Sequence, residues 1–174
     1  ANCVLEFNGG SITKGNYTIS QPSGYDSYII CQTAEKLIES SCFTEGQFVR
    51  TLGYYNPNDG GGGLFKIQTT IPVNSTLYYT LANGLYANCM DTDMVLPRYG
   101  GTYVNDMFDN LRTFAHKHQT KHVVLPAPNP NHPGCEYYMN DGVETYYWCV
   151  DDPIVIDENF AYFQFYFTGG IQVA

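Results

Sequence analysis

Short runs in which apolar and polar residues alternate dominate the sequence, and turn-forming residues separate them. Such runs, rich in Val, Ile, Tyr, Phe and Thr, are typical of β-strands. The turns include Asn83-Gly84 and Asp141-Gly142, whose residues tolerate the positive φ of tight hairpins. The pattern predicts a mainly β protein with strands at residues 3–7, 17–20, 28–32, 48–52, 64–68, 77–81, 85–89, 122–125, 145–150, 154–156 and 161–167.

One segment departs from this alternation, because its apolar residues recur three and four positions apart. Within residues 105–119, Met107, Leu111 and Phe114 fall on one face of a helix. We therefore predict one amphipathic helix at about 105–119, with Asn105 or Asp106 as its cap. In a β protein such a helix covers one face or one open end of the sheet. A second, short helix is predicted at residues 33–40.

Length, composition and charge restrict the class of protein. The chain has 174 residues, of which 44% are hydrophobic and 14% charged, enough for one well-buried core but not for two ordinary domains. The net charge is −9 and the Lys and Arg residues are scattered, so no nucleic-acid partner is expected. No apolar run approaches the roughly 20 residues of a transmembrane helix, so no membrane insertion is expected.

The order of the elements divides this one continuous domain into three segments. Residues 1–44 are a β-rich leading segment, 45–104 are glycine-rich, and 105–174 contain the helix and the later strands. Both ends are strand-like, so we expect an excerpt of a longer chain. The aromatic run at 160–167 would be covered by further chain or by a neighbouring subunit. Alternatively, it pairs within the domain as a central strand.

The run Gly60–Gly63 raises the question of a phosphate-binding loop. Such a loop needs a strand before it, a helix after it, and a lysine or further glycine in register. Here residues 64–68 alternate like a strand. We therefore interpret Gly60, Gly61, Gly62 and Gly63 as a structural turn.

The residues that carry chemistry form no recognisable catalytic or metal-binding set. Carboxylate pairs such as Asp91 and Asp93 lie in apparent turns, where solvation explains them. The six cysteines permit 15 disulfide pairings but equally suit buried free thiols, and both states stay open. We expect no metal, no cofactor and no catalytic residue in this chain. None of its histidines has the spacing of a metal site: His116, His118, His122 and His132.

Aromatic residues are the most suggestive feature of the composition, with 16 Tyr, 10 Phe and one Trp. Exposed Tyr and Trp rings offer flat apolar faces with polar rims, which suit sugar rings. The adjacent residues Tyr146, Tyr147 and Trp148 are therefore the candidate carbohydrate-binding site. The alternative is a strand whose aromatic side chains stack in a core or a subunit interface.

Two glycine-bearing stretches carry a family resemblance. Residues 45–67 are EGQFVRTLGYYNPNDGGGGLFKI, and residues 81–87 are LANGLYA. Together they resemble the segment that leads into pectate-lyase-like right-handed β-helices, as in bacteriophage tailspikes and appendages and some bacterial surface proteins. Residues 95–101, the predicted helix and VVLPA at 123–127 are similar to that family's first strand, capping helix and first coil strand. Residues 4–12 are similar to one β-helical rung.

The resemblance implies that the chain is the N-terminal lead-in and capping part of a right-handed parallel β-helix. The protein would then be a homotrimeric tailspike or tail-fibre component of a phage virion, in contact with other virion tail proteins. It would position a β-helix that recognises or degrades a host surface polysaccharide. The alternative is a secreted bacterial polysaccharide lyase or glycoside hydrolase whose active site lies in coils outside this segment. A purely structural virion component is the third interpretation.

Overall fold

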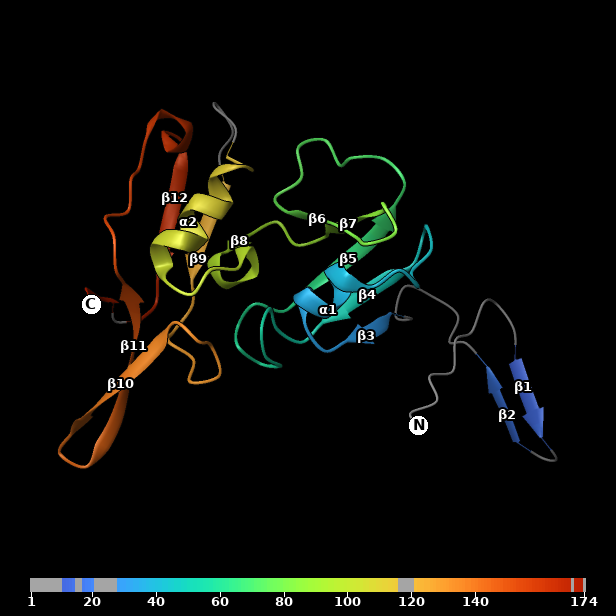
Figure 1. Ribbon diagram of the computed structural model, residues 1–174, viewed down its shortest axis with the longest axis horizontal. Helices are drawn as coiled ribbons and strands as arrows, with labels where there is room; N and C mark the ends of the chain where they lie inside the picture. Colours follow the sequence, from blue (N-terminus) through green and yellow to red (C-terminus); the bar gives the residue numbers. More distant parts are fainter. Residues whose placement is uncertain (1–10, 15–16, 21–27, 116–120, 170, 174) are drawn as a thin grey trace.

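The computed structural model describes residues 11–14, 17–20, 28–115, 121–169 and 171–173, and these residues form mostly strands with few helices (Figure 1). The mainly β fold is thus confirmed; the strand predicted at 3–7 lies outside the described residues. Strands β1 (Ser11–Lys14) and β2 (Tyr17–Ser20) pair as an antiparallel sheet. The other strands form one five-stranded and two three-stranded sheets. In this described part, no helix is long and apolar enough to span a bilayer.

The five-stranded sheet occupies residues 29–89. Its strand order is β3-β4-β5-β7-β6, in which β3 is parallel to β4 and the other neighbours are antiparallel. Helix α1 (Ala34–Glu39) makes the crossover between the parallel strands, and the Thr33 hydroxyl caps it by accepting a hydrogen bond from the Lys36 N–H at 3.2 Å. The strands are β3 (Ile29–Cys31), β4 (Phe48–Thr51), β5 (Gly63–Gln68), β6 (Tyr78–Thr80) and β7 (Tyr86–Cys89).

Two three-stranded sheets follow, and most of their neighbouring strands are parallel. The sheet β12-β9-β8 is wholly parallel and aligns Met94, Val123 and Phe165 in one column. In the other sheet β13 is parallel to β11, and β10 forms an antiparallel hairpin with β11. The strands are β8 (Met94–Val95), β9 (Lys121–Leu125), β10 (Cys135–Asn140), β11 (Val143–Val150), β12 (Phe163–Phe167) and β13 (Ile171–Val173).

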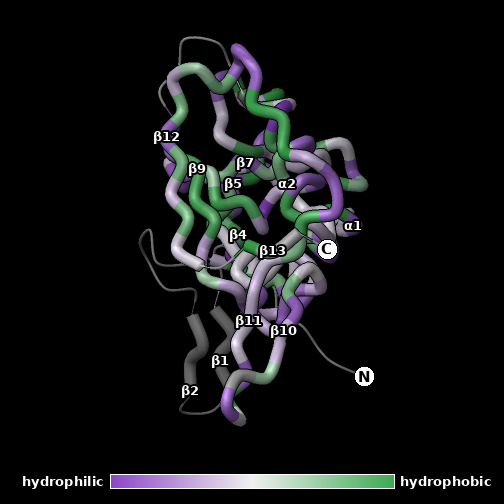
Figure 2. The backbone as a smooth tube through the Cα atoms, turned by 90° about the vertical axis from the view of Figure 1, so that its left-hand side faces the viewer, coloured by the Kyte–Doolittle hydropathy of each residue, from purple (hydrophilic) through white to green (hydrophobic). Residues whose placement is uncertain are grey.

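The chain passes through these two sheets twice in the same order. It runs through β9 and β11, and then through β12 and β13, which pair with β9 and β11 respectively. Trp148 pairs with Ile171, 23 residues later, whereas Val123 pairs with Phe165, 42 residues later. The longer passage contains the β10–β11 hairpin, which projects away from the sheets and ends in a hydrophilic turn (Figure 1, Figure 2).

Helix α2 (Val104–Arg112) covers the parallel strands with its apolar face. Met107 and Leu111 are fully buried, and the Phe108 ring centroid lies 5.8 Å from that of Phe165 on β12. The apolar spacing that predicted the helix is therefore the spacing of its buried face. Two 3₁₀ helices complete the elements: η1 (Leu96–Tyr99) and η2 (Glu158–Phe160).

The loop between β4 and β5 closes around a buried carboxylate. Asp59 has no exposed surface. Its two carboxylate oxygens accept hydrogen bonds of 2.8–3.1 Å from four backbone N–H groups, those of Tyr54, Tyr55, Asn56 and Gly61. Such donors replace the water that a buried carboxylate loses, and bonds to a charged acceptor are the strong ones. The acid therefore fixes the course of the loop.

The glycines of this loop meet two different requirements. Gly60 has a φ of +92°, a conformation that L side chains rarely adopt. Gly61 lies outside that region, but a Cβ atom there would come within 2.7 Å of the Tyr54 Cβ and 2.8 Å of the Pro97 carbonyl oxygen. Gly63 already belongs to β5, so the run leads into a strand and not into a helix.

The same loop joins the five-stranded sheet to the later part of the chain. The Asn56 side-chain amide donates to the Asn131 carbonyl at 3.0 Å. In the opposite direction, the Asn129 amide donates to the Asn58 carbonyl at 2.6 Å. A shift of this loop would therefore displace the segment that leads into β10.

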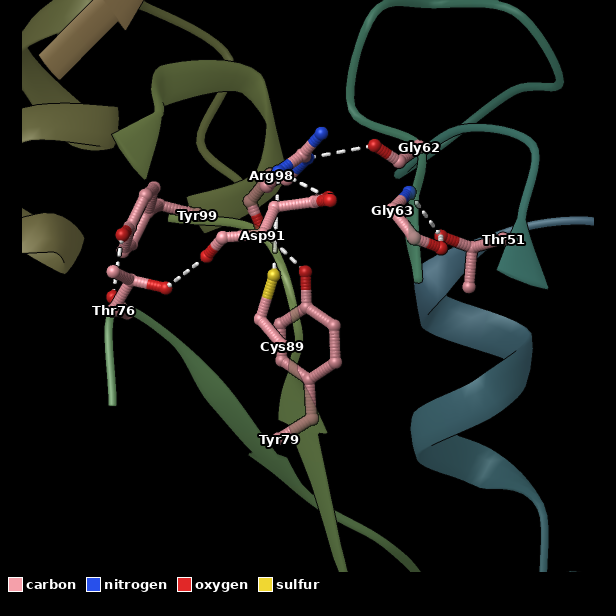
Figure 3. A network of polar contacts seen from close by, with 9 residues as sticks. All are labelled: Thr51, Gly62, Gly63, Thr76, Tyr79, Cys89, Asp91, Arg98 and Tyr99. Atoms are coloured by element: carbon pink, nitrogen blue, oxygen red, sulfur yellow. Dashed lines mark hydrogen bonds and ion pairs between the residues drawn. The ribbon is translucent and has the colours of Figure 1, made fainter. Parts of the chain in front are cut away.

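Arg98 provides a second link between the sheets (Figure 3). Its Nε donates to the Gly62 carbonyl at 2.6 Å, and its guanidinium lies 2.8 Å from the Asp91 carboxylate. The Tyr79 hydroxyl of β6 donates to the Arg98 carbonyl at 2.5 Å. Only 14% of the Arg98 side chain is exposed, so water competes little for these contacts.

Most of the predicted strands are confirmed to within two residues, as is the short helix at 33–40. Strands β1, β8, β10 and β13 lie outside the strand ranges that the alternation predicts, and only the family resemblance indicated a strand at residues 95–101, next to β8. The aromatic run pairs within the domain, but β12 is the outer strand of its sheet and not a central one. Among the described residues, one edge of β12 therefore has no partner strand. The three segment boundaries stay predictions.

Two local predictions are wrong. Residues 154–156 are not a strand, because Arg112 binds the Val155 carbonyl at 2.7 Å and Pro153 has no N–H to give to a sheet. Helix α2 starts earlier and ends at Arg112, well before the predicted end at residue 119. Neither predicted cap holds the N-cap position; the Asp106 carboxylate instead accepts a hydrogen bond from the Tyr103 N–H at 3.0 Å.

We expect Asp59→Asn to destabilise the fold by about 3 kcal/mol, since the amide group of Asn cannot accept the hydrogen bonds that one carboxylate oxygen now receives. Urea unfolding followed by circular dichroism measures the change. Asp152→Asn is the matched control, because Asp152 is exposed and its variant should unfold within about 0.5 kcal/mol of the parent. Equal midpoints for the two variants would contradict the role given to Asp59.

Candidate functional site

The candidate carbohydrate-binding residues lie on the β10–β11 hairpin and at its base. Tyr146 and Tyr147 are both half-buried and point to opposite faces of β11, since successive strand residues alternate. Tyr146 pairs directly with Tyr137, with ring centroids 5.7 Å apart. The Tyr147 ring lies 6.0 Å from that of Tyr138. Each face of the hairpin therefore carries a pair of tyrosines.

The outer part of the hairpin leaves large apolar side chains in contact with solvent. Tyr137 is 54% exposed, Met139 60% and Val143 65%. The turn is formed by Asp141 and Gly142, both with positive φ, as a two-residue hairpin turn requires. A projecting ribbon with exposed rings on both faces is typical of a surface that contacts another molecule.

A carboxylate accompanies each of the two predicted tyrosines. The Tyr146 hydroxyl donates to Glu144 at 2.6 Å, and the Tyr147 hydroxyl donates to Glu136 at 3.0 Å. These hydrogen bonds, made by the protonated phenols, raise the pKa of both tyrosines. Each face therefore combines flat rings with an oriented phenol and a carboxylate, groups that can stack on a sugar ring and accept hydrogen bonds from its hydroxyls.

Trp148 has a different place from its two neighbours. Its side chain is fully buried, and its indole N–H donates to the Pro126 carbonyl at 2.8 Å. The ring packs edge-on against His132 at 4.9 Å between centroids. Trp148 therefore anchors the base of the hairpin and does not present its ring at the surface. Carbohydrate binding by Tyr146 and Tyr147 stays a prediction.

His132 is a buried neutral histidine beneath the hairpin. It is 1% exposed, and its Nδ1 accepts a hydrogen bond from the Gly134 N–H at 3.0 Å. The ring proton must then lie on Nε2, which has no hydrogen-bond partner among the described residues. Burial lowers the pKa of His132 to about 4, although the nearby Asp59 acts in the opposite direction. A neutral ring between Tyr55 and Trp148 is the result.

The other candidate groups serve structural contacts. Cys31, Cys42, Cys89, Cys135 and Cys149 are free thiols, and Cys3 lies outside the described residues. Within the described ranges, no group of three or more His, Cys, Asp or Glu side chains could hold a metal ion. The acids of the paired motifs bind cations of the chain or cap a helix, as in the Asp157–Arg112, Asp91–Arg98 and Asp106–Tyr103 contacts.

Sequence reasoning missed Tyr137 and Tyr138, which complete the tyrosine pairs. A signal was present, because Glu136-Tyr137-Tyr138 precedes the turn Asp141-Gly142 at the same distance at which Thr145-Tyr146-Tyr147 follows it. Two runs of this kind around such a turn predict a hairpin with cross-strand tyrosines.

The comparisons with known proteins concern the fold. The sequence matches no protein-family model and no curated protein. Among solved structures, the enzymatically active domain of tailspike protein 4 from bacteriophage CBA120 is similar, with a TM-score of 0.54 and 11% identity over 86% of this chain and 18% of that chain. The corresponding domain of tailspike protein 2 from the same phage has a TM-score of 0.41 and 14% identity over 56% of this chain and 16% of that chain.

The fold of this chain is therefore tailspike-like and mainly β. The chain spans less than a fifth of the length of the tailspike structures that it resembles. At 11% identity the first similarity concerns the arrangement of the backbone and carries no residue roles.

The histidine predicts a pH dependence of stability. The pKa of His132 in the folded chain is about 4, below the value of about 6.5 of an unfolded histidine, so the unfolded state takes up the proton first. The contribution of His132 to the free energy of unfolding should be fully present above pH 6.5. It should fall by about 3 kcal/mol in total as the pH drops to 4. Urea unfolding between pH 4.5 and 7.5 measures this slope.

The variant His132→Asn separates this histidine from the other acids that titrate in the same range. Asn offers an oxygen to the Gly134 N–H but does not titrate. The variant should therefore lose less stability than the parent chain between pH 7 and 4.5, whatever its stability at pH 7. Parallel pH profiles of the two proteins would show that His132 is not the group responsible.

Proposed function

We propose that this chain is a component of a phage tailspike or tail fibre, in which it leads into a parallel β-helix that contacts a host surface polysaccharide. The observation that carries the proposal is the repeated path of the chain, in which β12 pairs on β9 and β13 pairs on β11, both in parallel. The similarity of the fold to a tailspike domain over 86% of this chain supports it.

The register of the parallel strands supports a β-helical coil. The step of 23 positions from Trp148 to Ile171 brings the chain once around to the neighbouring strand of the same sheet. A solenoid is built from such passages, each of which contacts only its neighbours. Parallel crossovers are right-handed in almost all proteins, which favours the right-handed form. Helix α2 then lies where a capping helix is needed, beside the first strands of the stack.

The tyrosine pairs of the β10–β11 hairpin favour a role in glycan binding. The hairpin is an insertion into one passage of the coil, so its sequence can vary without disturbing the stack. The rings of Tyr137 and Tyr138 are exposed. Glu144 and Glu136 accept hydrogen bonds from the hydroxyls of the half-buried Tyr146 and Tyr147. The role of the hairpin in recognition would be to add aromatic contacts beside the coil surface.

Assembly in a reducing cytosol, followed by incorporation into the virion tail, fits the five free thiols. The secreted polysaccharide lyase or glycoside hydrolase remains the alternative, because the similar structure is described as an enzymatically active domain. Either protein would carry its catalytic groups in the coils that this chain does not include. A homotrimer with other tail proteins as neighbours would cover the aromatic side chains of β12, of which Tyr166 and Phe167 are each 48% exposed.

Tyr137→Ala/Tyr146→Ala should remove binding to bacterial surface polysaccharides on a glycan array, because it deletes both rings of one hairpin face. We expect at least a tenfold loss of signal for any polysaccharide that the parent chain binds. Tyr28→Ala is the control, since Tyr28 is an exposed tyrosine beside β3. If the parent binds no polysaccharide, or if the double variant binds as well as the parent, the glycan role of the hairpin is wrong.

The homotrimer predicts a mass in solution of three times 19.5 kDa. Size-exclusion chromatography with light scattering measures it. Phe167→Ser, which places a polar group on the exposed outer strand, should shift the distribution towards the monomer. A parent chain that is monomeric at every concentration would contradict the trimer, whatever the glycan array shows.

A further inference from the structure

A polar cavity of about 500 Å³ lies where the five-stranded sheet meets the wholly parallel sheet. It is lined by residues 73–76, by residues 88–93 between β7 and β8, and by Lys121 and His122 at the start of β9. Its volume falls within the roughly 300–1,000 Å³ of small-molecule sites. The three lining segments are distant in sequence, and the fold brings them together.

Contacts within the chain hold part of the lining of this cavity in place. The Thr76 hydroxyl donates to the Asp91 carbonyl at 2.9 Å, and the Asp91 carboxylate lies 2.8 Å from the Arg98 guanidinium (Figure 3). The Ser75 hydroxyl donates to the Asn88 side-chain oxygen at 2.6 Å, which orients the amide group. Because these groups are already fixed, a ligand would lose little free energy in ordering them.

Another part of the lining is more open, and its aromatic ring is the imidazole of His122. Asp93 and His122 have about half of their side-chain surface exposed, with 3.7 Å between the Asp93 carboxylate and the His122 Nδ1. The His122 ring lies 5.7 Å from the Tyr166 ring of β12. A carboxylate acceptor beside the partly exposed His122 ring matches a sugar, which has hydroxyl donors at its edge and apolar C–H groups on its face.

Charge decides which saccharides fit. Arg98 balances Asp91, and Lys121 offsets Asp93 within the lining, so the cavity itself is close to neutral. The whole chain carries a net charge of −9, which repels polyanions. We propose that this cavity binds one or two sugar units of a neutral saccharide. The site rests on the proposed function, as a second glycan contact separate from the tyrosine hairpin.

Nuclear magnetic resonance of the 19.5 kDa chain tests the proposal with named probes. The methyl glycosides of glucose, galactose and N-acetylglucosamine, together with maltose, are titrated to 100 mM, and galacturonic acid serves as the charged comparator. At least one neutral probe should shift the backbone amides of residues 88–93 and 121–122 in a saturable way. Galacturonic acid should shift them less. Absence of a saturable shift with every neutral probe would overturn the proposal.

Variants of Asp93 and His122 locate the site. Asp93→Ala should weaken binding of the neutral probe about tenfold, because it removes the carboxylate acceptor, and His122→Ala should weaken it as well. Asp109→Ala is the matched control, since its side chain is 74% exposed on α2 and it should bind like the parent. The amide spectrum of each variant verifies that the fold is retained. Unchanged binding by Asp93→Ala and His122→Ala would overturn the cavity as the site.

The hairpin variant Tyr137→Ala/Tyr146→Ala distinguishes this proposal from the function on which it rests. Retained shifts at residues 88–93 in that variant support the cavity, whereas shifts that disappear with the hairpin tyrosines refute it. A chain that binds no polysaccharide on the array and has the mass of a monomer would contradict the tailspike function. Saturable binding of small sugars at the cavity would support the saccharide site even in that case.

Discussion

One buried carboxylate fixes the loop that joins the five-stranded sheet to the segment before β10. Asp59 sits in a loop with no exposed surface and receives hydrogen bonds from four backbone N–H groups at 2.8–3.1 Å. Those bonds give the loop one shape, and that shape places the amide of Asn56 and the carbonyl of Asn58 against the segment before β10. These two hydrogen bonds act together with the contacts of Arg98 to join the five-stranded sheet to the later part of the chain.

The β10–β11 hairpin follows the segment that this loop holds. The hairpin has an anchored base and an exposed end. At the base, Trp148 and His132 are buried and pack on one another, and the indole N–H binds the Pro126 carbonyl. Two and three residues beyond the Cys135–Trp148 pair, Tyr137 and Tyr138 are half-exposed. Because buried aromatic packing resists rotation, the exposed rings are held on a stiff support, and stiffness lowers the entropy that binding must overcome.

The sequence predicts local structure well here, since β5 and α2 carry their apolar patterns within a few consecutive residues. It does not predict β8 or β13, because strands of two and three residues form only through parallel partners many residues away. For the same reason the glycine loop was recognised as a turn, but the convergence of four amides on Asp59 was not. The sequence does not predict the cavity at residues 88–93 either, since its lining comes from three separate segments.

The basic residues explain why surfaces that bear aromatic rings suit this chain better than an anion-binding one. Among the described side chains, Arg98 and Arg112 are committed to carbonyls and carboxylates, and Lys36 pairs with Glu39. Arg50 and Lys66 lie over aromatic rings. These five cations make contacts within the chain and the net charge is −9, so phosphate and uronate groups are attracted little outside the neighbourhood of Lys121. The proposed glycan recognition therefore rests on stacking and on hydrogen bonds to hydroxyls, for which the hairpin and the cavity have suitable groups.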